Sequence, residues 1–283
     1  MRLRILAWLI AAASAFIAVS QAAAQLTARE EIVRIPASGA TMIATVMRVP
    51  VEGKRPLVVI NHGSPADGSQ RSKMALPRYH ALSSWFLSRG YVVVLPLRRG
   101  YGETGGAWAE TFGKCATPDY YNAGLQGASD IKAAIDFMRG KPYVAADRTI
   151  VVGQSAGGWA TVALSSLNPP GVPGMVNFAG GRGGQQDLDD DEVGNCAPDA
   201  LVKAAGRYGS TARVPMIWLY TENDSFFEPD LARRMVKAYD DAGGKATLHA
   251  LGPFGDDGHT LAGSDSGVSM WSGPVAAFLG SLK

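Results

Sequence analysis

Short apolar runs alternate with amphipathic stretches along most of this chain. Residues 57–60 are continuously apolar, which is typical of a strand buried on both faces of a parallel sheet. The predicted strands are 31–35, 42–49, 57–60, 91–95, 149–152, 175–178, 216–221 and 247–251, and the predicted helices are 77–89, 125–138, 156–165, 230–242 and 268–282. Strands that alternate with helices predict an α/β fold with a mostly parallel central sheet and helices on both faces.

Two segments depart from this alternation. Residues 31–35 and 42–49 are joined by a turn at Ser38 and Gly39 and predict an N-terminal hairpin. Residues 180–212 are rich in glycine and carry an acidic run at 187–192. We interpret them as a loop or lid that runs over the sheet edge, and the acidic run as a solvated face rather than a metal site. No repeat or linker is visible, so one α/β domain is expected over residues 25–283.

The N-terminus has the order of regions found in a secretory signal. Residues 1–4 are basic, residues 5–19 are uncharged and mostly apolar, and residues 22–24 are three alanines that provide an A-x-A cleavage site. An apolar run of this length falls short of the ~20 residues that span a bilayer. We therefore expect residues 1–24 to be cleaved, with export to the periplasm or the medium and no stable membrane insertion.

Charge and cysteine content narrow the class of protein. The 27 Lys and Arg against 25 Asp and Glu give a net charge of +2, so there is no basic excess to bind nucleic acid. Four His and two Cys are too scattered for a zinc pattern. In an oxidising compartment, Cys115 and Cys196 predict one disulfide between two loops, the alternative being two free thiols.

Residues 153–157 read Gly-Gln-Ser-Ala-Gly and fit the G-x-S-x-G nucleophile elbow. This turn between a strand and a helix holds the serine in a strained conformation, with its hydroxyl above the sheet. The five-residue pattern is weak by itself. Its place between a predicted strand and a predicted helix is stronger evidence that Ser155 is a nucleophile, although Ser155 could instead cap the helix that follows.

Four further motifs follow predicted strands. They are Asn-His-Gly-Ser-Pro at 61–65, Arg-Gly-Tyr-Gly-Glu-Thr at 99–104, Asn-Asp at 223–224 and Gly-His at 258–259. In this order, with the elbow at 153–157, they make residues 40–283 resemble the α/β-hydrolase superfamily, and within it the serine hydrolases similar to dienelactone hydrolase. Dienelactone hydrolase itself has a cysteine nucleophile where this chain has Ser155, so the resemblance implies ester hydrolysis rather than that enzyme's special substrate.

The resemblance implies a role for each site residue. Ser155 is the expected nucleophile, His259 its general base and Asp224 the acid that orients the imidazole. The backbone N–H groups of Ala156 and Ser64 are the expected oxyanion donors, since Pro65 has no N–H. An acyl-enzyme reaction of this kind needs no metal and no organic cofactor.

Other residues of the same types compete for these roles. His62 precedes the oxyanion loop and is expected to make structural hydrogen bonds. His80 falls on a predicted helix and His249 within a predicted strand. The alternative acids are Asp256, Asp257 and Asp265. The first two are too close to His259 in sequence to approach its ring easily from the far side.

Substrate binding is expected from the loops at 104–122 and 180–212, because loops over strand ends set specificity in such folds. The candidate residues are Arg99, Tyr101, Trp108, Trp159 and Arg182. Arg98, Arg99 and Arg182 could pair with a substrate carboxylate, while structural ion pairs are the simpler interpretation for at least two of them. Trp108, Tyr120 and Tyr121 are expected in the roof of the pocket.

One motif points elsewhere, and two functions compete with ester hydrolysis. Residues 100–105 match the G-x-G-x-x-G dinucleotide pattern, but the sequence after them is loop-like and lacks the helix that a pyrophosphate needs.

The same triad also cleaves peptides. Peptidases of the oligopeptidase type usually carry a gating domain, for which this length leaves no room. A non-catalytic binding protein is the other alternative. The expected partner is a small-molecule ester, and the oligomeric state is left open.

Overall fold

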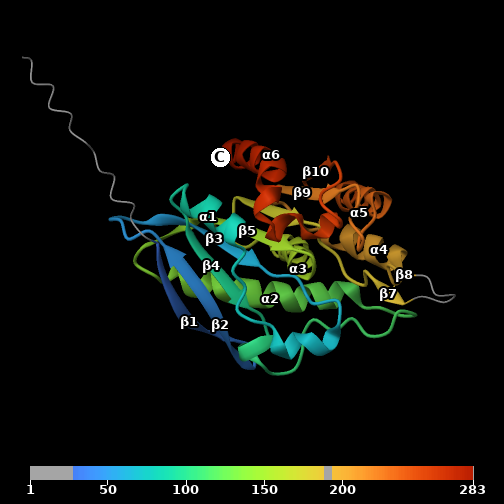
Figure 1. Ribbon diagram of the computed structural model, residues 1–283, viewed down its shortest axis with the longest axis horizontal. Helices are drawn as coiled ribbons and strands as arrows, with labels where there is room; N and C mark the ends of the chain where they lie inside the picture. The colour runs from blue at the N-terminus through green and yellow to red at the C-terminus, as the bar shows by residue number, and fades with distance from the viewer. Residues whose placement is uncertain (1–27, 188–192, 283) are drawn as a thin grey trace, which may run out of the picture.

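The computed structural model describes residues 28–187 and 193–282 (Figure 1). Its main sheet has eight strands in the order β1-β2-β4-β3-β5-β6-β9-β10. These strands are β1 (Arg29–Ala37), β2 (Ala40–Arg48), β3 (Arg55–Asn61), β4 (Val92–Leu97), β5 (Val144–Gln154), β6 (Gly174–Phe178), β9 (Met216–Thr221) and β10 (Ala246–Leu251). The six strands from β4 to β10 run parallel, and β2 pairs antiparallel with both β1 and β4. The predicted α/β class with a mostly parallel sheet is confirmed.

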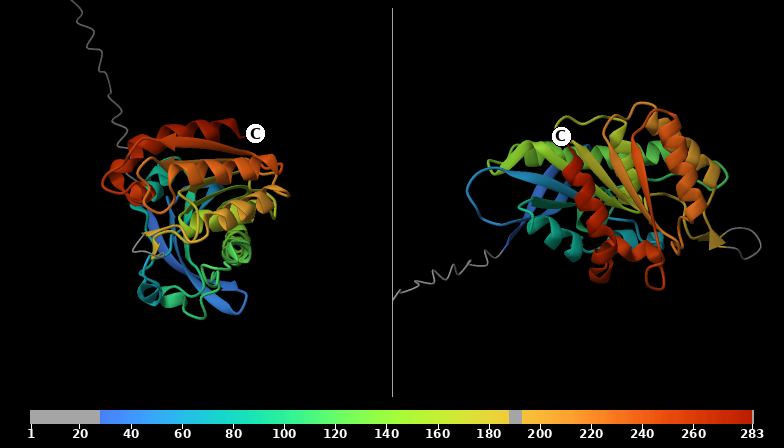
Figure 2. Two further views of the ribbon diagram at one scale, coloured as in Figure 1. Left: turned by 90° about the vertical axis from the view of Figure 1, so that its right-hand side faces the viewer. Right: turned by 90° about the horizontal axis from the view of Figure 1, so that it is seen from above.

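Helices cover both faces of the twisted sheet (Figure 1, Figure 2). One face packs against α1 (His80–Leu87) and α6 (Val268–Ser281), and the other against α2 (Tyr120–Arg139), α3 (Ala156–Ser165), α4 (Pro198–Gly209) and α5 (Pro229–Asp241). Successive strand residues point to opposite faces. Val58 and Ile60 therefore join the α1 and α6 core, while Leu57 and Val59 join the other.

The predicted hairpin and helices form, with shifted boundaries. Gly39 has a φ of +74° at the turn between β1 and β2. Helix α1 begins at His80 rather than at residue 77, because Tyr79 adopts a left-handed backbone conformation (φ 41°, ψ 58°) just before it. Helix α2 begins earlier than its apolar spacing predicted. The Asp119 side chain accepts a hydrogen bond from the Asn122 backbone N–H and caps it.

The prediction of an irregular excursion over residues 180–212 is wrong in part. The segment contains a two-stranded ribbon, β7 (Gln186–Asp187) with β8 (Val193–Gly194), and the helix α4. The buried positions of α4 are at helical spacing and join the larger core: Leu201, Ala204, Ala205 and Tyr208. That periodicity was present in the sequence, but the surrounding glycines concealed it. Residues 188–192 of the acidic run lie outside the described residues, as does the predicted signal at 1–24.

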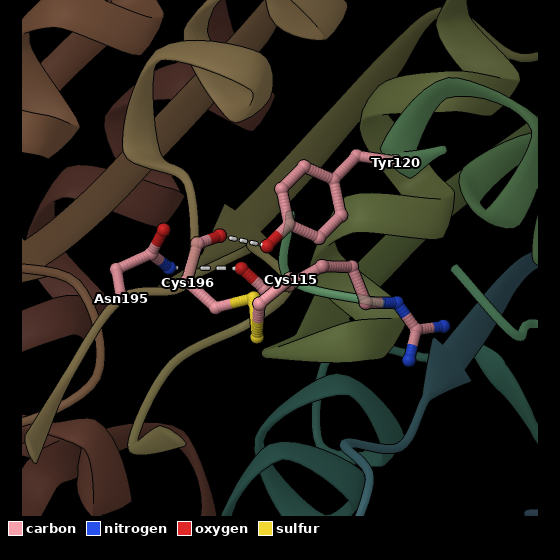
Figure 3. Close-up of a disulfide and its surroundings, with 5 residues drawn as sticks. Cys115, Tyr120, Asn195 and Cys196 are labelled. Carbon is pink, nitrogen blue, oxygen red and sulfur yellow. Dashed lines mark hydrogen bonds between the residues drawn. A yellow bond between two sulfur atoms is a disulfide. The ribbon is translucent and has the colours of Figure 1, made fainter. Parts of the chain in front are cut away.

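The predicted disulfide between Cys115 and Cys196 is confirmed. It joins the loop before α2 to the loop before α4 (Figure 3). The Tyr120 hydroxyl donates to the Cys196 carbonyl, and the Asn195 side-chain amide donates to the Arg182 carbonyl at 2.9 Å. Over the residues that the structure describes, no helix is long and apolar enough to cross a membrane.

Within residues 28–187 and 193–282, four 3-10 turns lie between the larger elements. They are η1 (Gly68–Lys73), η2 (Gly102–Thr104), η4 (Gly258–Gly263) and η5 (Asp265–Gly267). Three of them follow strands β3, β4 and β10, at the carboxyl edge of the parallel strands, where ligands bind in open α/β sheets.

Candidate active site

Ser155 lies at the turn between β5 and α3. Its φ of 55° and ψ of −122° are strained for a residue with a side chain. The flanking glycines are required by close approach, since a Cβ on Gly153 would lie 2.2 Å from the Gly157 carbonyl oxygen, and a Cβ on Gly157 2.3 Å from that of Asn61. The Ser155 side chain makes no capping hydrogen bond to α3. Ser155 is thus the N-cap residue of α3 by position, but its hydroxyl does not cap the helix.

Asp224 and His259 meet at the carboxyl ends of the neighbouring parallel strands β9 and β10. Nδ1 of His259 lies 3.1 and 3.2 Å from the two Asp224 carboxylate oxygens, and both side chains are buried. The backbone N–H groups of Phe226 and Phe227 donate to Oδ1 of Asp224 at 2.9 and 3.0 Å. The carboxylate is thus fixed from one side and holds the imidazole on the other.

The competing acids do not approach the His259 ring. Asp257 accepts hydrogen bonds from the His259 backbone N–H at 2.9 Å and from Ser225. It fixes the main chain of the loop rather than the ring. Asp256 and Asp265 are exposed. Of the candidate acids, Asp224 is the one that the structure places at Nδ1.

The competing histidines do not contact Asp224. His62 is fully buried, with Nδ1 2.7 Å from the Gly63 carbonyl oxygen and Nε2 accepting the Arg98 backbone N–H at 3.2 Å. Burial, aided by the Arg98 charge, lowers the pKa of His62 to about 3. Both ring nitrogens are occupied, so the expected structural role for His62 agrees with its contacts. His80 is the exposed first residue of α1, and His249 lies in β10.

A cavity of about 290 Å³ opens at Ser155. Ala156 and Ser64, the expected oxyanion residues, line it together with Ser155. Within the described residues, the Ser155 hydroxyl makes no hydrogen bond, to His259 or to another group. Catalytic hydrogen bonds are often long in unliganded enzymes and tighten when substrate binds.

A second cavity, of about 620 Å³, borders His259. Its other lining residues include Met74, Tyr79, Gln154 and Thr260. His259 therefore contacts Asp224 through Nδ1 and also borders this second space.

Comparison with solved structures supports the fold. The solved structures that resemble the chain include one provisionally assigned as a dienelactone hydrolase from Klebsiella pneumoniae, with 16% identity and a TM-score of 0.59 over 88% of this chain and 97% of that chain. An esterase from Pyrococcus furiosus matches with 14% identity and a TM-score of 0.64 over 91% and 94%.

The chain has the α/β-hydrolase fold.

Peptidases share the fold as well. Dipeptidyl peptidase 4 from Porphyromonas gingivalis matches this chain with 18% identity and a TM-score of 0.65, over 90% of this chain but only 36% of that one. Residues 77–170 match the model of the prolyl oligopeptidase family. No curated protein matches the chain.

The cavity at Ser155 has an aromatic and cationic wall. Phe112, Phe226 and Phe227 line it, as do Arg71 and Arg182. Among the described residues that line this cavity there is no aspartate or glutamate. The Arg71 guanidinium lies 3.8 Å from the centre of the Trp108 ring and forms no ion pair with the described residues.

Behind this wall, Glu110 is fully buried between two arginines. It pairs with Arg98 and with Arg182. Burial alone would raise the pKa of Glu110, but the two guanidinium charges lower it to about 2. One carboxylate pairs with two guanidinium groups, so Glu110, Arg98 and Arg182 together carry a net positive charge next to the cavity.

Two of the five expected substrate-binding residues line the cavity, namely Trp108 and Arg182. The other three do not. Arg99 pairs with Asp130 at 2.6 Å and reaches the Ser38 carbonyl. Tyr101 and Trp159 are fully buried, where the Tyr101 hydroxyl donates to Glu110 and Trp159 Nε1 to a backbone carbonyl.

The residues expected in the roof of the pocket are found there only in part. Residues 181–184 and Trp108 line the cavity, but the Tyr120 hydroxyl turns to Cys196 and Tyr121 stacks on Tyr208. Sequence reasoning missed Arg71. It lies in η1, just after the Asn-His-Gly-Ser-Pro motif, and that position was the available signal.

The dinucleotide-like motif at 100–105 forms the 3-10 turn η2 and ends at Gly105, which has a φ of 59°. The next helix after it is α2, which begins at Tyr120. The motif therefore lacks the helix N-terminus on which a pyrophosphate would lie.

Proposed function

We propose that this protein is a serine hydrolase that cleaves carboxylic esters of small molecules through an acyl-enzyme. The observation that carries the proposal is the contact between Asp224 and His259 beside an elbow that holds Ser155 in a strained conformation. Strain of this kind is concentrated at functional sites. A buried carboxylate at Nδ1 leaves Nε2 of the imidazole to exchange a proton with Ser155.

The reaction follows from these positions. As Ser155 Oγ attacks the ester carbonyl carbon, His259 Nε2 takes the hydroxyl proton. The carbonyl oxygen becomes an oxyanion, which the backbone N–H groups of Ala156 and Ser64 stabilise. Collapse of the tetrahedral intermediate expels the alcohol, to which His259 gives its proton. Water then attacks the acyl-enzyme by the same route, and the acid is released.

The elbow also contributes to charge stabilisation. Ala156 is the first residue of α3, so its N–H lies at a helix N-terminus, where the backbone dipoles favour negative charge. Asp224 is held by the two N–H groups of Phe226 and Phe227. This leaves the carboxylate charge available to stabilise the imidazolium that forms during the reaction.

The size of the cavity favours small esters. A space of about 290 Å³ accommodates a short or single-ring acyl group. Two parts of its lining, Trp108 to Gly113 without Ala109 and Glu110 on one side and residues 181–184 on the other, belong to the chain segments that the disulfide Cys115–Cys196 joins. The match of residues 77–170 to the prolyl oligopeptidase family keeps peptide or amide hydrolysis as the second candidate.

Export is part of the proposal. It is supported by the signal-like order of residues 1–24 and by the disulfide between Cys115 and Cys196, since such bridges form and persist in oxidising compartments.

A matched pair of substrates tests ester against amide specificity. We expect p-nitrophenyl acetate to be hydrolysed, and p-nitroacetanilide and aminoacyl p-nitroanilides to be cleaved at least about 10²-fold more slowly. Comparable kcat/KM on an anilide would instead assign the protein as a peptidase. Failure on both, with the fold intact, would favour a binding protein.

A further inference from the structure

We propose that Gln154 and Tyr79 form a positioning pair that joins the three segments of the active site. The inference rests on the proposed function. Neither side chain is assigned a step in the reaction. Both connect the oxyanion loop at 62–65, the elbow at 153–157 and the loop that carries His259.

The pair is a continuous chain of hydrogen bonds. The Gly63 backbone N–H donates to the Tyr79 hydroxyl at 3.2 Å, and that hydroxyl donates to Oε1 of Gln154 at 2.9 Å. Nε2 of Gln154 then donates to the backbone carbonyl of His259 at 3.1 Å. Two side chains thus link the main chain of the oxyanion loop to the main chain of the general base.

Local structure is arranged to make this chain possible. Tyr79 is in the left-handed region, which is unfavourable for a residue with a side chain. The first turn of α1 holds it there, because the Ser83 backbone N–H donates to the Tyr79 carbonyl at 2.8 Å and the Ser83 hydroxyl to the Arg78 carbonyl at 2.7 Å. An unfavourable backbone that places a hydroxyl beside an active site points to function rather than to folding.

Gly63 provides the necessary space. A Cβ on Gly63 would lie 2.5 Å from Oε1 of Gln154 and 3.1 Å from the Cβ of Ser155. The Gln154 amide therefore passes directly over the oxyanion loop, next to the nucleophile. Gln154, Tyr79 and His259 also line one cavity, the second one described above, so the pair and the proposed general base border the same space.

The consequence concerns geometry at the reacting atoms. Asp224 fixes the imidazole ring of His259 through Nδ1, while Gln154 fixes the main chain of the same residue. Without Gln154, the ring could remain paired with Asp224 yet shift relative to Ser155. A misplacement of about 1 Å in an active site lowers the rate by up to about 10²-fold. Loss of the pair should therefore lower kcat and leave KM unchanged.

The test uses Tyr79→Phe, Gln154→Met and the double variant. Tyr91→Phe is the control, since the Tyr91 hydroxyl has no hydrogen-bond partner among the described residues. We measure kcat and KM on p-nitrophenyl acetate, the rate at which a fluorophosphonate labels Ser155, and Tm. Labelling reports activation of the nucleophile and does not depend on the choice of ester substrate.

Each single variant should fold, lower kcat and the labelling rate by about 10- to 100-fold, and keep the KM of the wild type. Because the two side chains act as one unit, the double variant should be no slower than the more impaired single variant. If either folded single variant kept the wild-type kcat and labelling rate, the positioning pair would be contradicted. It would also be contradicted if the losses of the two single variants multiplied in the double variant. If a fluorophosphonate did not label Ser155 in the wild type, the proposed function would fail together with the pair.

Discussion

The ring of Phe226 stacks on the imidazole of His259, with 4.0 Å between the ring centres and 23° between the planes. The backbone N–H of the same residue donates to Oδ1 of Asp224 at 2.9 Å. One residue therefore packs on the proposed base and fixes the proposed acid, and its side chain also lines the cavity at Ser155.

This relationship predicts that Phe226→Ala loosens the imidazole. The backbone N–H survives the substitution and still holds Asp224, so the loss is that of the ring alone. We expect kcat to fall about 10-fold or more, while Phe226→Tyr, which keeps the ring, stays close to wild type. Steady-state kinetics normalised to titrated active sites measure the effect. Equal kcat in all three proteins would show that the stacking does not position the base.

The disulfide is expected to act on substrate binding as well as on stability. It closes a separation of 81 residues and joins the segments whose neighbours form two walls of the cavity. The double variant Cys115→Ser, Cys196→Ser should lose about 2–5 kcal/mol of unfolding free energy. At a temperature where it remains folded, its KM should rise and its kcat should change little. Urea titration tests the loss of stability, and steady-state kinetics test the rise in KM. An unchanged KM would show that the disulfide does not shape the cavity.

The cationic wall predicts a preference for an acyl group that carries a carboxylate. Arg71 has no anionic partner among the described residues and lies on the face of Trp108 at the cavity. The p-nitrophenyl monoester of adipic acid should therefore have a higher kcat/KM than p-nitrophenyl hexanoate, which has the same number of acyl carbons. A hydrogen bond to a charged group contributes about 1.5–3 kcal/mol.

In Arg71→Met, kcat/KM for the adipate monoester should fall at least about 10-fold. The kcat/KM for p-nitrophenyl hexanoate should stay at the wild-type value. The exposed Arg148→Met is the matched control. An equal loss on both esters would mean that Arg71 acts through packing rather than through its charge.

Glu110→Gln is expected to be strongly destabilising. It leaves the buried guanidinium groups of Arg98 and Arg182 without their shared carboxylate, and breaking a buried ion pair by removing one partner costs about 3–5 kcal/mol. The pKa of Glu110 is lowered from 4.5 to about 2 in the folded protein. The contribution of the carboxylate is therefore complete above about pH 4.5 and is lost as the pH falls toward 2.

Urea unfolding across this range measures the prediction, with the exposed Glu103→Gln as the control. The difference in unfolding free energy between wild type and Glu110→Gln should shrink as the pH falls. A difference that stays constant with pH would contradict a charged Glu110.

The sequence predicted the parts of this molecule that depend on order along the chain. Motifs that follow parallel strands must meet at one edge of the sheet, so Asp224 and His259 could be expected to meet, and they do. The elbow at Ser155 was visible because close approach requires glycine at 153 and 157. The disulfide followed from two cysteines and a signal-like N-terminus.

The spacing of residues along the sequence did not predict the directions of the side chains. Arg99 and Tyr101 follow β4 next to the site, yet Asp130 and Glu110 draw them away from the cavity. Arg71 and the shared ion pair of Glu110 depend on contacts between loops far apart in sequence, which no periodicity encodes. Helix α4 was missed for a different reason, because its apolar spacing lay within a glycine-rich segment.

The most direct test of the proposed function is hydrolysis of p-nitrophenyl esters from acetyl to decanoyl, with Ser155→Ala beside the wild type. The account predicts turnover by the wild type, fastest on the shorter acyl chains that a cavity of about 290 Å³ can hold, and loss of at least about 10³-fold in Ser155→Ala. Equal turnover by a folded Ser155→Ala protein would contradict a Ser155 nucleophile.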